Sequence, residues 1–143
     1  MPVPMSDVIQ WITAQGWNGN QETGCPLVMG PYIPDTPDNL VVVTATSGPG
    51  YMLEGVTDVS GFQARVRGGQ SGDGSTTAQE ATESLAYALD GLIFNAAFPC
   101  VLGSGRVLVA AHRLAGIPTP MPQASDDSSR MTYVCSYLIE VSN

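Results

Sequence analysis

The sequence contains no lysine, only one histidine and no closely spaced pair of cysteines. Five Arg stand against thirteen Asp and Glu, which gives a net charge of −8. Proteins that wrap nucleic acid need a basic surface for the phosphates, so the composition disfavours that class. Without lysine the chain cannot form the GxxxxGK[ST] loop that binds nucleotide phosphates. A single histidine likewise excludes a metal site built from several histidines.

Long apolar runs and targeting signals are also missing. No apolar run approaches the roughly 20 residues that a membrane-spanning helix needs, so we expect no membrane partner. The first residues lack the basic and apolar regions of a signal peptide. Cys25, Cys100 and Cys135 are odd in number and widely spaced, which favours buried or half-buried thiols over a disulfide framework. The length predicts one domain, residues 1–143, with its own core.

The clearest structural pattern lies in residues 62–95. Phe62, Ala64 and Val66 alternate with polar residues, which predicts a strand with one buried face. A Gly-rich polar loop over residues 68–75 follows. Thr77 and Glu80 then have the spacing of a capping box at the start of a long helix. The apolar stripe of this helix is predicted to contain Ala81, Leu85, Ala88, Leu89, Leu92 and Ala96.

The rest of the chain predicts short elements around this centre. A short helix is expected over residues 7–15, capped by Ser6 and stopped by Gly16. Strands are expected over residues 25–30, at an edge because of Pro26, and over residues 40–46, 106–113 and 131–141. Residues 47–50 should end the second strand and residues 51–60 should be irregular. The fold class is α+β: a mainly antiparallel sheet of about four strands packed against one long helix, with a short N-terminal helix.

Residues with catalytic potential are few. His112 lies on a predicted strand, and no GxSxG motif supplies a nucleophile. Glu80 and Glu83 are helical neighbours that could pair as acid and base, although a solvated helix face is the simpler explanation. Gly72 and Gly74 precede a helix, but the third glycine of a dinucleotide fingerprint is missing. We therefore predict no catalytic residue, cofactor or metal.

Charged residues instead suggest contacts between molecules. Arg65 and Arg67 project from the same side of their strand and are candidates for ion pairs between subunits, beside the alternative of an ordinary polar face. Three acids of the long helix are candidates for an acidic wall: Glu80, Glu83 and Asp90. Two polar loops are candidates for contacts with partner proteins, at residues Gly72, Asp73, Gly74, Asp126 and Asp127.

Several motifs in order resemble the tail terminator proteins of long-tailed bacteriophages, often described as minor capsid or minor tail proteins. They are a Pro-Asp-Thr-Pro-Asp-Asn loop at residues 34–39, Gly-Pro-Gly at 48–50, Phe-Gln-Ala-Arg-Val-Arg-Gly-Gly at 62–69 and the helix from Thr77. The resemblance covers most of the chain. The long loops at residues 51–60 and 116–129 depart from a compact family member.

The resemblance implies a structural protein of the virion rather than an enzyme. Such proteins form a six-fold ring, here a homohexamer, that caps the tail tube, ends its polymerisation and joins the tail to the head connector. Tail tube protein and connector would be the partners, and DNA would pass through the bore without specific binding. The localisation would be the phage neck, after assembly in the host cytoplasm. A head completion or connector protein and a small α+β enzyme using Glu80, Glu83 or His112 are the alternatives.

Overall fold

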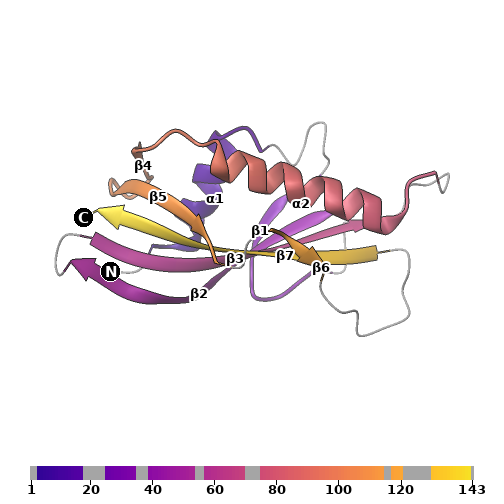
Figure 1. Cartoon of the computed structure of the whole chain (residues 1–143), viewed down its shortest axis with the longest axis horizontal. Coiled ribbons are helices and arrows are strands. Elements are labelled where there is room, and N and C mark those ends of the chain that lie inside the picture. Colours follow the sequence, from indigo (N-terminus) through magenta and orange to yellow (C-terminus); the bar gives the residue numbers. More distant parts are fainter. Residues whose placement is uncertain are drawn as a thin grey trace.

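The computed structural model describes residues 3–17, 25–34, 39–53, 57–69, 75–114, 117–120 and 130–142. Two helices and seven strands follow one another along this part of the chain (Figure 1). In chain order they are α1 (Met5–Ala14), β1 (Leu27–Met29), β2 (Leu40–Leu53), β3 (Thr57–Gly69), α2 (Ala78–Phe94), β4 (Cys100–Val101), β5 (Val107–Arg113), β6 (Thr119–Pro120) and β7 (Arg130–Ser142). Within the described residues, no helix is long and apolar enough to cross a membrane.

All seven strands belong to one sheet with the order β1-β2-β3-β7-β5-β4. The short strand β6 pairs with β7 on the side away from β3, next to β5. β1 and β2 run parallel, and the other described pairs run antiparallel. The sheet curls into a half-barrel, and both helices lie on the same face of it (Figure 1). The predicted fold of about four strands against one long helix is therefore wrong.

The two additional strands, β4 and β6, were not visible in the sequence because of their length. Each has two residues, which is too short for an alternating pattern to be recognised. The edge position predicted for the first strand is confirmed, since β1 pairs with β2 at one end of the sheet. The interior position predicted for residues 40–46 is confirmed too, because β2 lies between β1 and β3.

The Gly-Pro-Gly motif does not end β2, contrary to the prediction. β2 continues to Leu53 and β3 already begins at Thr57, so most of the predicted irregular connection is strand. The register between β2 and β3 shifts between Thr46 and Gly50. Such an irregularity interrupts the ladder of hydrogen bonds and accommodates a proline, which has no N–H to donate.

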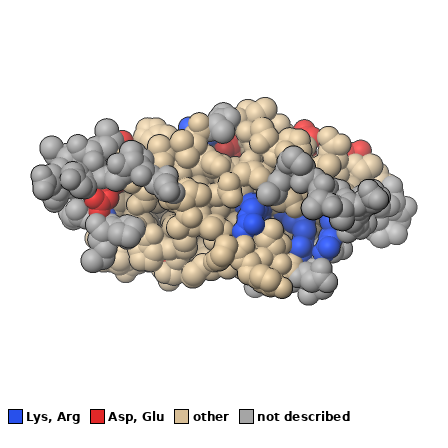
Figure 2. All heavy atoms as spheres, turned by 90° about the horizontal axis from the view of Figure 1, so that it is seen from below, with Lys and Arg blue, Asp and Glu red and all other residues tan. Residues whose placement is uncertain are grey.

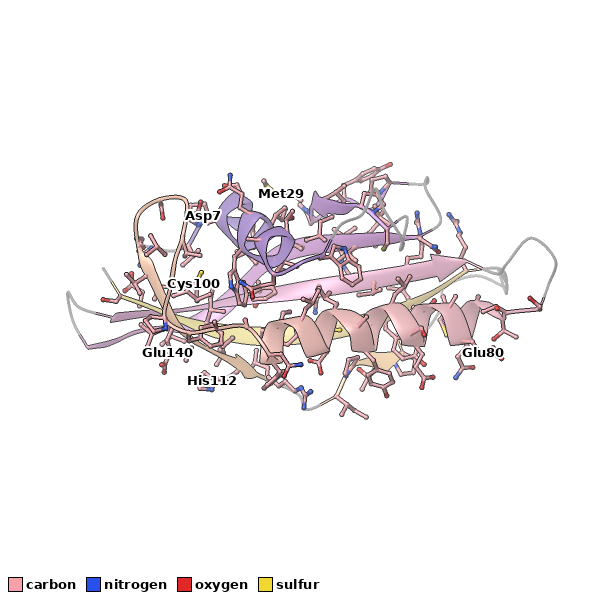
Figure 3. All side chains as sticks on the ribbon, turned by 90° about the horizontal axis from the view of Figure 1, so that it is seen from above. Asp7, Met29, Glu80, Cys100, His112 and Glu140 are labelled. Atoms are coloured by element: carbon pink, nitrogen blue, oxygen red, sulfur yellow. The ribbon has the colours of Figure 1, made fainter. Side chains whose placement is uncertain are left out.

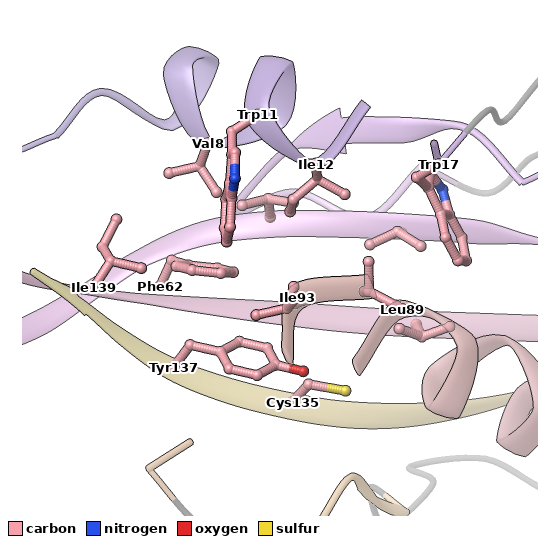
Figure 4. Packing of buried hydrophobic residues seen from close by; sticks show 14 of the residues in the cluster. Val8, Trp11, Ile12, Trp17, Phe62, Leu89, Ile93, Cys135, Tyr137 and Ile139 are labelled. Atoms are coloured by element: carbon pink, nitrogen blue, oxygen red, sulfur yellow. The ribbon is translucent and has the colours of Figure 1, made fainter. Parts of the chain in front are cut away.

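The core lies between the sheet and the two helices. The alternation predicted for β3 and β7 is confirmed, since Phe62 and Tyr137 are 0 % and 1 % exposed and their ring centroids lie 5.1 Å apart. Trp11 of α1 and Leu89 of α2 cover this pair of strands from the same side (Figure 4). Burial of these large side chains provides the main driving force for folding.

α1 begins earlier than predicted. It starts at Met5 after Pro4, so Ser6 lies within the helix and its predicted capping role is wrong. Gly16 has a φ of 113°, which confirms it as the left-handed residue that stops the helix. The side of α1 that faces the sheet is mainly apolar, and its Val8 is 1 % exposed.

α2 begins where the capping box placed it, but it buries a different face. The Thr77 hydroxyl accepts a hydrogen bond of 3.2 Å from the backbone N–H of Glu80. The predicted stripe is wrong in part, because Ala88 is exposed. The residues that α2 buries are Ala78, Thr82, Ala86, Leu89, Asp90 and Ile93. Two of these are polar, and an apolar pattern cannot find them.

Thr82 marks a close approach of α2 to the sheet at Gly68. The Thr82 hydroxyl lies 2.6 Å from the Ala78 carbonyl oxygen and 3.1 Å from that of Met131. A Cβ atom at Gly68 would lie 2.6 Å from the Thr82 hydroxyl oxygen and 2.9 Å from its backbone nitrogen. The prediction that Gly68 belongs to a loose loop without packing residues is therefore wrong. Gly68 is part of β3 and lets the helix approach.

Gly68→Ala is expected to lower the free energy of unfolding by about 1–3 kcal/mol, because the new methyl group overlaps backbone of α2. Gly91→Ala is the matched control on α2 itself. A Cβ there meets nothing within 4 Å, so alanine should stabilise the helix by up to about 1 kcal/mol. Urea unfolding followed by circular dichroism measures both changes. Equal stability of the two variants would contradict the close approach.

Candidate subunit interface

The face of the sheet opposite the helices carries most of the positive charge. Arg65 lies opposite Val42 and Val134 in the sheet, and Arg67 and Arg130 belong to the same set of alternate positions. Three of the five arginines therefore share this open face. Figure 2, which views the molecule from this side, shows the basic atoms gathered largely in one patch.

The segment that follows β1 crosses part of the open face. The Arg65 guanidinium donates hydrogen bonds of 2.5 Å to the Pro31 carbonyl oxygen and 3.3 Å to the Thr44 hydroxyl. A Cβ at Gly30 would lie 2.8 Å from a methyl carbon of Val42, so the backbone here rests directly on the sheet. This crossing explains why Val42 is 1 % exposed although it faces away from both helices.

A large aromatic side chain stands exposed on this segment, since Tyr32 is 81 % exposed. Arg65 lies beside it through the bond to the carbonyl oxygen of Pro31, the preceding residue. Met29, 56 % exposed at the end of β1, pairs with Val43 and so lies on the helix side of the sheet. We call Tyr32 and Arg65 the underside patch. An aromatic ring this exposed next to an ordered guanidinium is a combination typical of protein interfaces.

The two arginines predicted to join subunits differ in burial. Arg67 is only 8 % exposed, whereas Arg65 is half-buried and reaches the segment that carries Tyr32. An ion pair with another molecule needs an accessible guanidinium. Arg65 is therefore the stronger of the two candidates.

A second group of exposed side chains lies on the flank of α2 that faces β7. Gln79 and Glu83 both interact with the Tyr133 hydroxyl, which donates a hydrogen bond of 3.4 Å to Glu83. Tyr87 lies one further turn along the helix, near the same tyrosine, and is 43 % exposed. This flank therefore combines a half-buried carboxylate with an exposed aromatic ring.

The same flank continues past the end of β5. The Arg113 guanidinium lies 4.0 Å from the centre of the Phe94 ring, which is 43 % exposed. Leu114 and Ile117, just before β6, are 51 % and 60 % exposed. We call Glu83, Tyr87, Phe94, Leu114 and Ile117 the flank patch. It lies on the β5–β6 side of the sheet, whereas the underside patch lies on the β1 side.

Asp90 was predicted to belong to an acidic wall, but it lies on the buried face of α2. It is 4 % exposed, and it accepts hydrogen bonds of 2.8 Å from the Tyr137 hydroxyl and 3.1 Å from Arg113 Nε. A second Arg113 nitrogen donates to its other oxygen. Burial raises the pKa of Tyr137, so its hydroxyl stays protonated and donates. The cluster fastens α2 to β5 and β7, and its carboxylate is fully engaged within the subunit.

Glu80 and Glu83 are neighbours on one turn of α2, as predicted, but Glu80 is exposed whereas the Glu83 carboxylate accepts a hydrogen bond from Tyr133. His112 lies on β5 near the other end of the helix and is not brought together with Glu80 (Figure 3). His112 is 55 % exposed in its side chain and lies 3.7 Å from Glu140. Among the described residues, no group of three or more His, Cys, Asp and Glu could hold a metal ion.

The three cysteines form no disulfide with one another, and the prediction of buried or half-buried thiols is confirmed. Cys25 and Cys135 are buried and Cys100 is intermediate. Burial raises the pKa of Cys25 and of Cys135 to about 12. Both thiols therefore stay protonated near neutral pH and behave as small apolar groups.

Some predicted contact residues lie outside the described part of the chain. These are Gly72, Asp73, Gly74, Asp126 and Asp127. Sequence reasoning also missed Tyr32 and Ile117, two of the most exposed large apolar residues. Both are next to prolines, in segments whose apolar residues show neither helical nor strand periodicity. The only sign of an exposed contact residue in the sequence was a single apolar residue in such a segment.

No protein-family model matches the chain, and no curated protein has a sequence that matches it. The geometry of the two patches and the order of the sequence motifs are therefore what bears on function.

Proposed function

We propose that this protein is a tail terminator of a long-tailed bacteriophage. It forms a ring that caps the tail tube, ends tube polymerisation and joins the tail to the head connector, with DNA passing through the bore. In this role it is a structural protein of the phage neck and works without catalytic residues or cofactors. Its partners are further copies of itself, expected to be six in the ring, the tail tube protein and the connector.

The observation that supports the ring is that two different groups of exposed side chains, the underside patch and the flank patch, lie at different places around one sheet. Exposed aromatic side chains next to ordered charged groups are typical of contacts between proteins. Because the patches differ, a contact between them is heterologous, and such contacts close into a ring when the rotation between neighbours permits it. A single self-complementary patch would instead favour a two-fold dimer.

Net charge agrees with a channel for DNA. A charge of −8 repels phosphates, so a passing duplex would not adhere to the ring. Glu80, exposed at the start of α2, remains our candidate for the wall of the bore. Asp90 is not proposed for this wall, because its carboxylate is buried within the subunit.

Mass photometry and negative-stain microscopy test this function. The purified protein is expected to form rings by itself or with its tail tube protein, and to stop the elongation of tubes by capping their ends. A protein that stays monomeric at high concentration, also with tube protein present, would contradict the proposal. Rings that bind the connector but leave tube elongation unchanged would indicate a neck protein instead.

A further inference from the structure

We infer that the underside patch of one copy docks onto the flank patch of the next copy, so that Arg65 of the first faces Glu83 of the second. The inference rests on the proposed ring and assigns the surfaces that form its seam. The occupant of each patch is therefore a second copy of this chain.

Charge complementarity selects this pairing. The underside patch combines the Tyr32 ring with the cation of Arg65, and the flank patch combines the Tyr87 ring with the carboxylate of Glu83. Near the axis of a two-fold contact, two underside patches would bring guanidinium against guanidinium and two flank patches would bring Glu83 against Glu83. Arg113, on the same flank, is already paired with Asp90 within its own subunit. Like charges across an interface cost several kcal/mol, so the mixed pairing is preferred.

Both charged groups are held in place before any contact forms. Hydrogen bonds to Pro31 and Thr44 position the Arg65 guanidinium, and the Tyr133 hydroxyl positions the Glu83 carboxylate. Ordered side chains lose less conformational entropy on binding. Both hydrogen bonds of Arg65 use its Nη2 and its Nε is buried, so Nη1 is the group that can donate to the Glu83 carboxylate of the next copy.

The apolar residues supply the affinity on both sides. Tyr32, at 81 % exposure, is the most exposed large hydrophobic side chain described, and on the flank patch Ile117 is 60 % exposed. Tyrosine and arginine are the residues that most often dominate binding energy in protein interfaces. Burial of the apolar surfaces of both patches gives the contact its affinity, and the ion pair gives it specificity.

A nucleic acid is the less favoured occupant of the underside patch. Although Arg65, Arg67 and Arg130 share the open face, Arg67 is 8 % exposed and the net charge of the chain is −8. Phosphate binding needs several accessible cations and falls steeply with salt. Tyr32 also offers apolar surface, which suits a protein partner better than a phosphate backbone.

A charge exchange between two variants tests the seam. Arg65→Glu and Glu83→Arg are each expected to weaken ring formation about 100-fold, because every seam then joins like charges. Mixed in equal amounts, the two variants should form rings again, since alternating copies restore an opposite pair at each seam. Glu80→Arg, one turn earlier on α2, is the matched control and should assemble like wild type.

The outcomes separate this inference from the proposed function. Two results would overturn the seam but not the ring itself. In the first, wild type forms rings and both variants fold, but mixing them restores no rings. In the second, neither charge reversal affects ring formation. Recovery as a dimer of one copy of each variant would show an isologous contact and would also overturn the seam. Absence of wild-type rings, with tube protein present, is instead a failure of the proposed function.

A second experiment applies if Arg65→Glu does not fold, since the change removes the bond to Pro31. Tyr32→Cys combined with Tyr87→Cys, in a Cys100→Ser background, should give a ladder of oligomers with a short bis-maleimide linker. Each single cysteine variant should stay uncrosslinked at the same concentration, because one seam joins two different patches. If wild type forms rings but the double cysteine variant gives no ladder of oligomers, the inference is overturned.

Binding of duplex DNA tests the other occupant. Tight binding by wild type that is lost in Arg65→Gln would assign the underside patch to nucleic acid.

Discussion

Asp90→Ala is expected to lower the free energy of unfolding by about 3–4 kcal/mol. The change removes the acceptor of a 2.8 Å hydrogen bond from Tyr137, whose hydroxyl remains buried without it. It also removes the carboxylate that holds Arg113 across α2 and β5. The side chain of Arg113 is 35 % exposed and can turn to water, so most of the cost falls on the tyrosine.

Thermal unfolding measures this loss as a decrease of about 6–14 °C in the melting temperature. Glu80→Gln, an exposed acid on the same helix, is the matched control and should change the free energy of unfolding by less than about 0.5 kcal/mol. The double variant with Arg113→Ala should cost at least about 1 kcal/mol less than the sum of the two single changes. Simple additivity would show that the two groups do not interact in the folded protein.

The same cluster shows why the sequence predicted α2 correctly but not its buried face. Thr77 and Glu80 lie three residues apart, so the start of the helix is a local signal. Burial of Asp90 depends on Arg113 and Tyr137, which lie 23 and 47 residues further along the chain. From the sequence alone, an acidic residue whose partners lie far along the chain is predicted to be solvated, because only the fold brings those partners next to it.

The sheet divides in a similar way between predictable and unpredictable strands. β3 and β7 have 13 residues each, and their alternation identifies both the strands and the side that faces the helices. β4 and β6 have two residues each and exist because β5 and β7 present free ladder positions to them. Pairing supplied by a neighbouring strand leaves no pattern in the short strand itself.

The candidate interface was predictable only on its charged side. Arg65 stood out because it alternates with Phe62, Ala64 and Val66 on a recognisable strand. Tyr32 did not, since its position depends on how residues 30–34 cross the sheet. That crossing needs Gly30, where any Cβ would meet Val42 at 2.8 Å. A glycine that permits close approach looks in the sequence like any other glycine next to a proline.

Tyr32→Ala is expected to dissociate the rings without changing the stability of the subunit. In the isolated chain the side chain is 81 % exposed, so its removal should alter the free energy of unfolding by less than about 0.5 kcal/mol. At the seam the same ring is removed from water between two copies. Truncation of a central aromatic residue typically costs about 2 kcal/mol or more, which weakens each seam by about 30-fold.

Closure makes this loss larger for the ring than for any single contact, because each copy carries the change and every seam is weakened at once. Mass photometry over a dilution series should therefore show monomers for Tyr32→Ala where wild type still forms rings. Val101→Ala is the control: Val101 is 70 % exposed on β4, outside both patches, and its truncation should leave the rings intact. If rings of Tyr32→Ala persist to the same dilution as wild-type rings, Tyr32 is not part of the seam. Dissociation by Val101→Ala alone would place it on the β4 edge of the sheet.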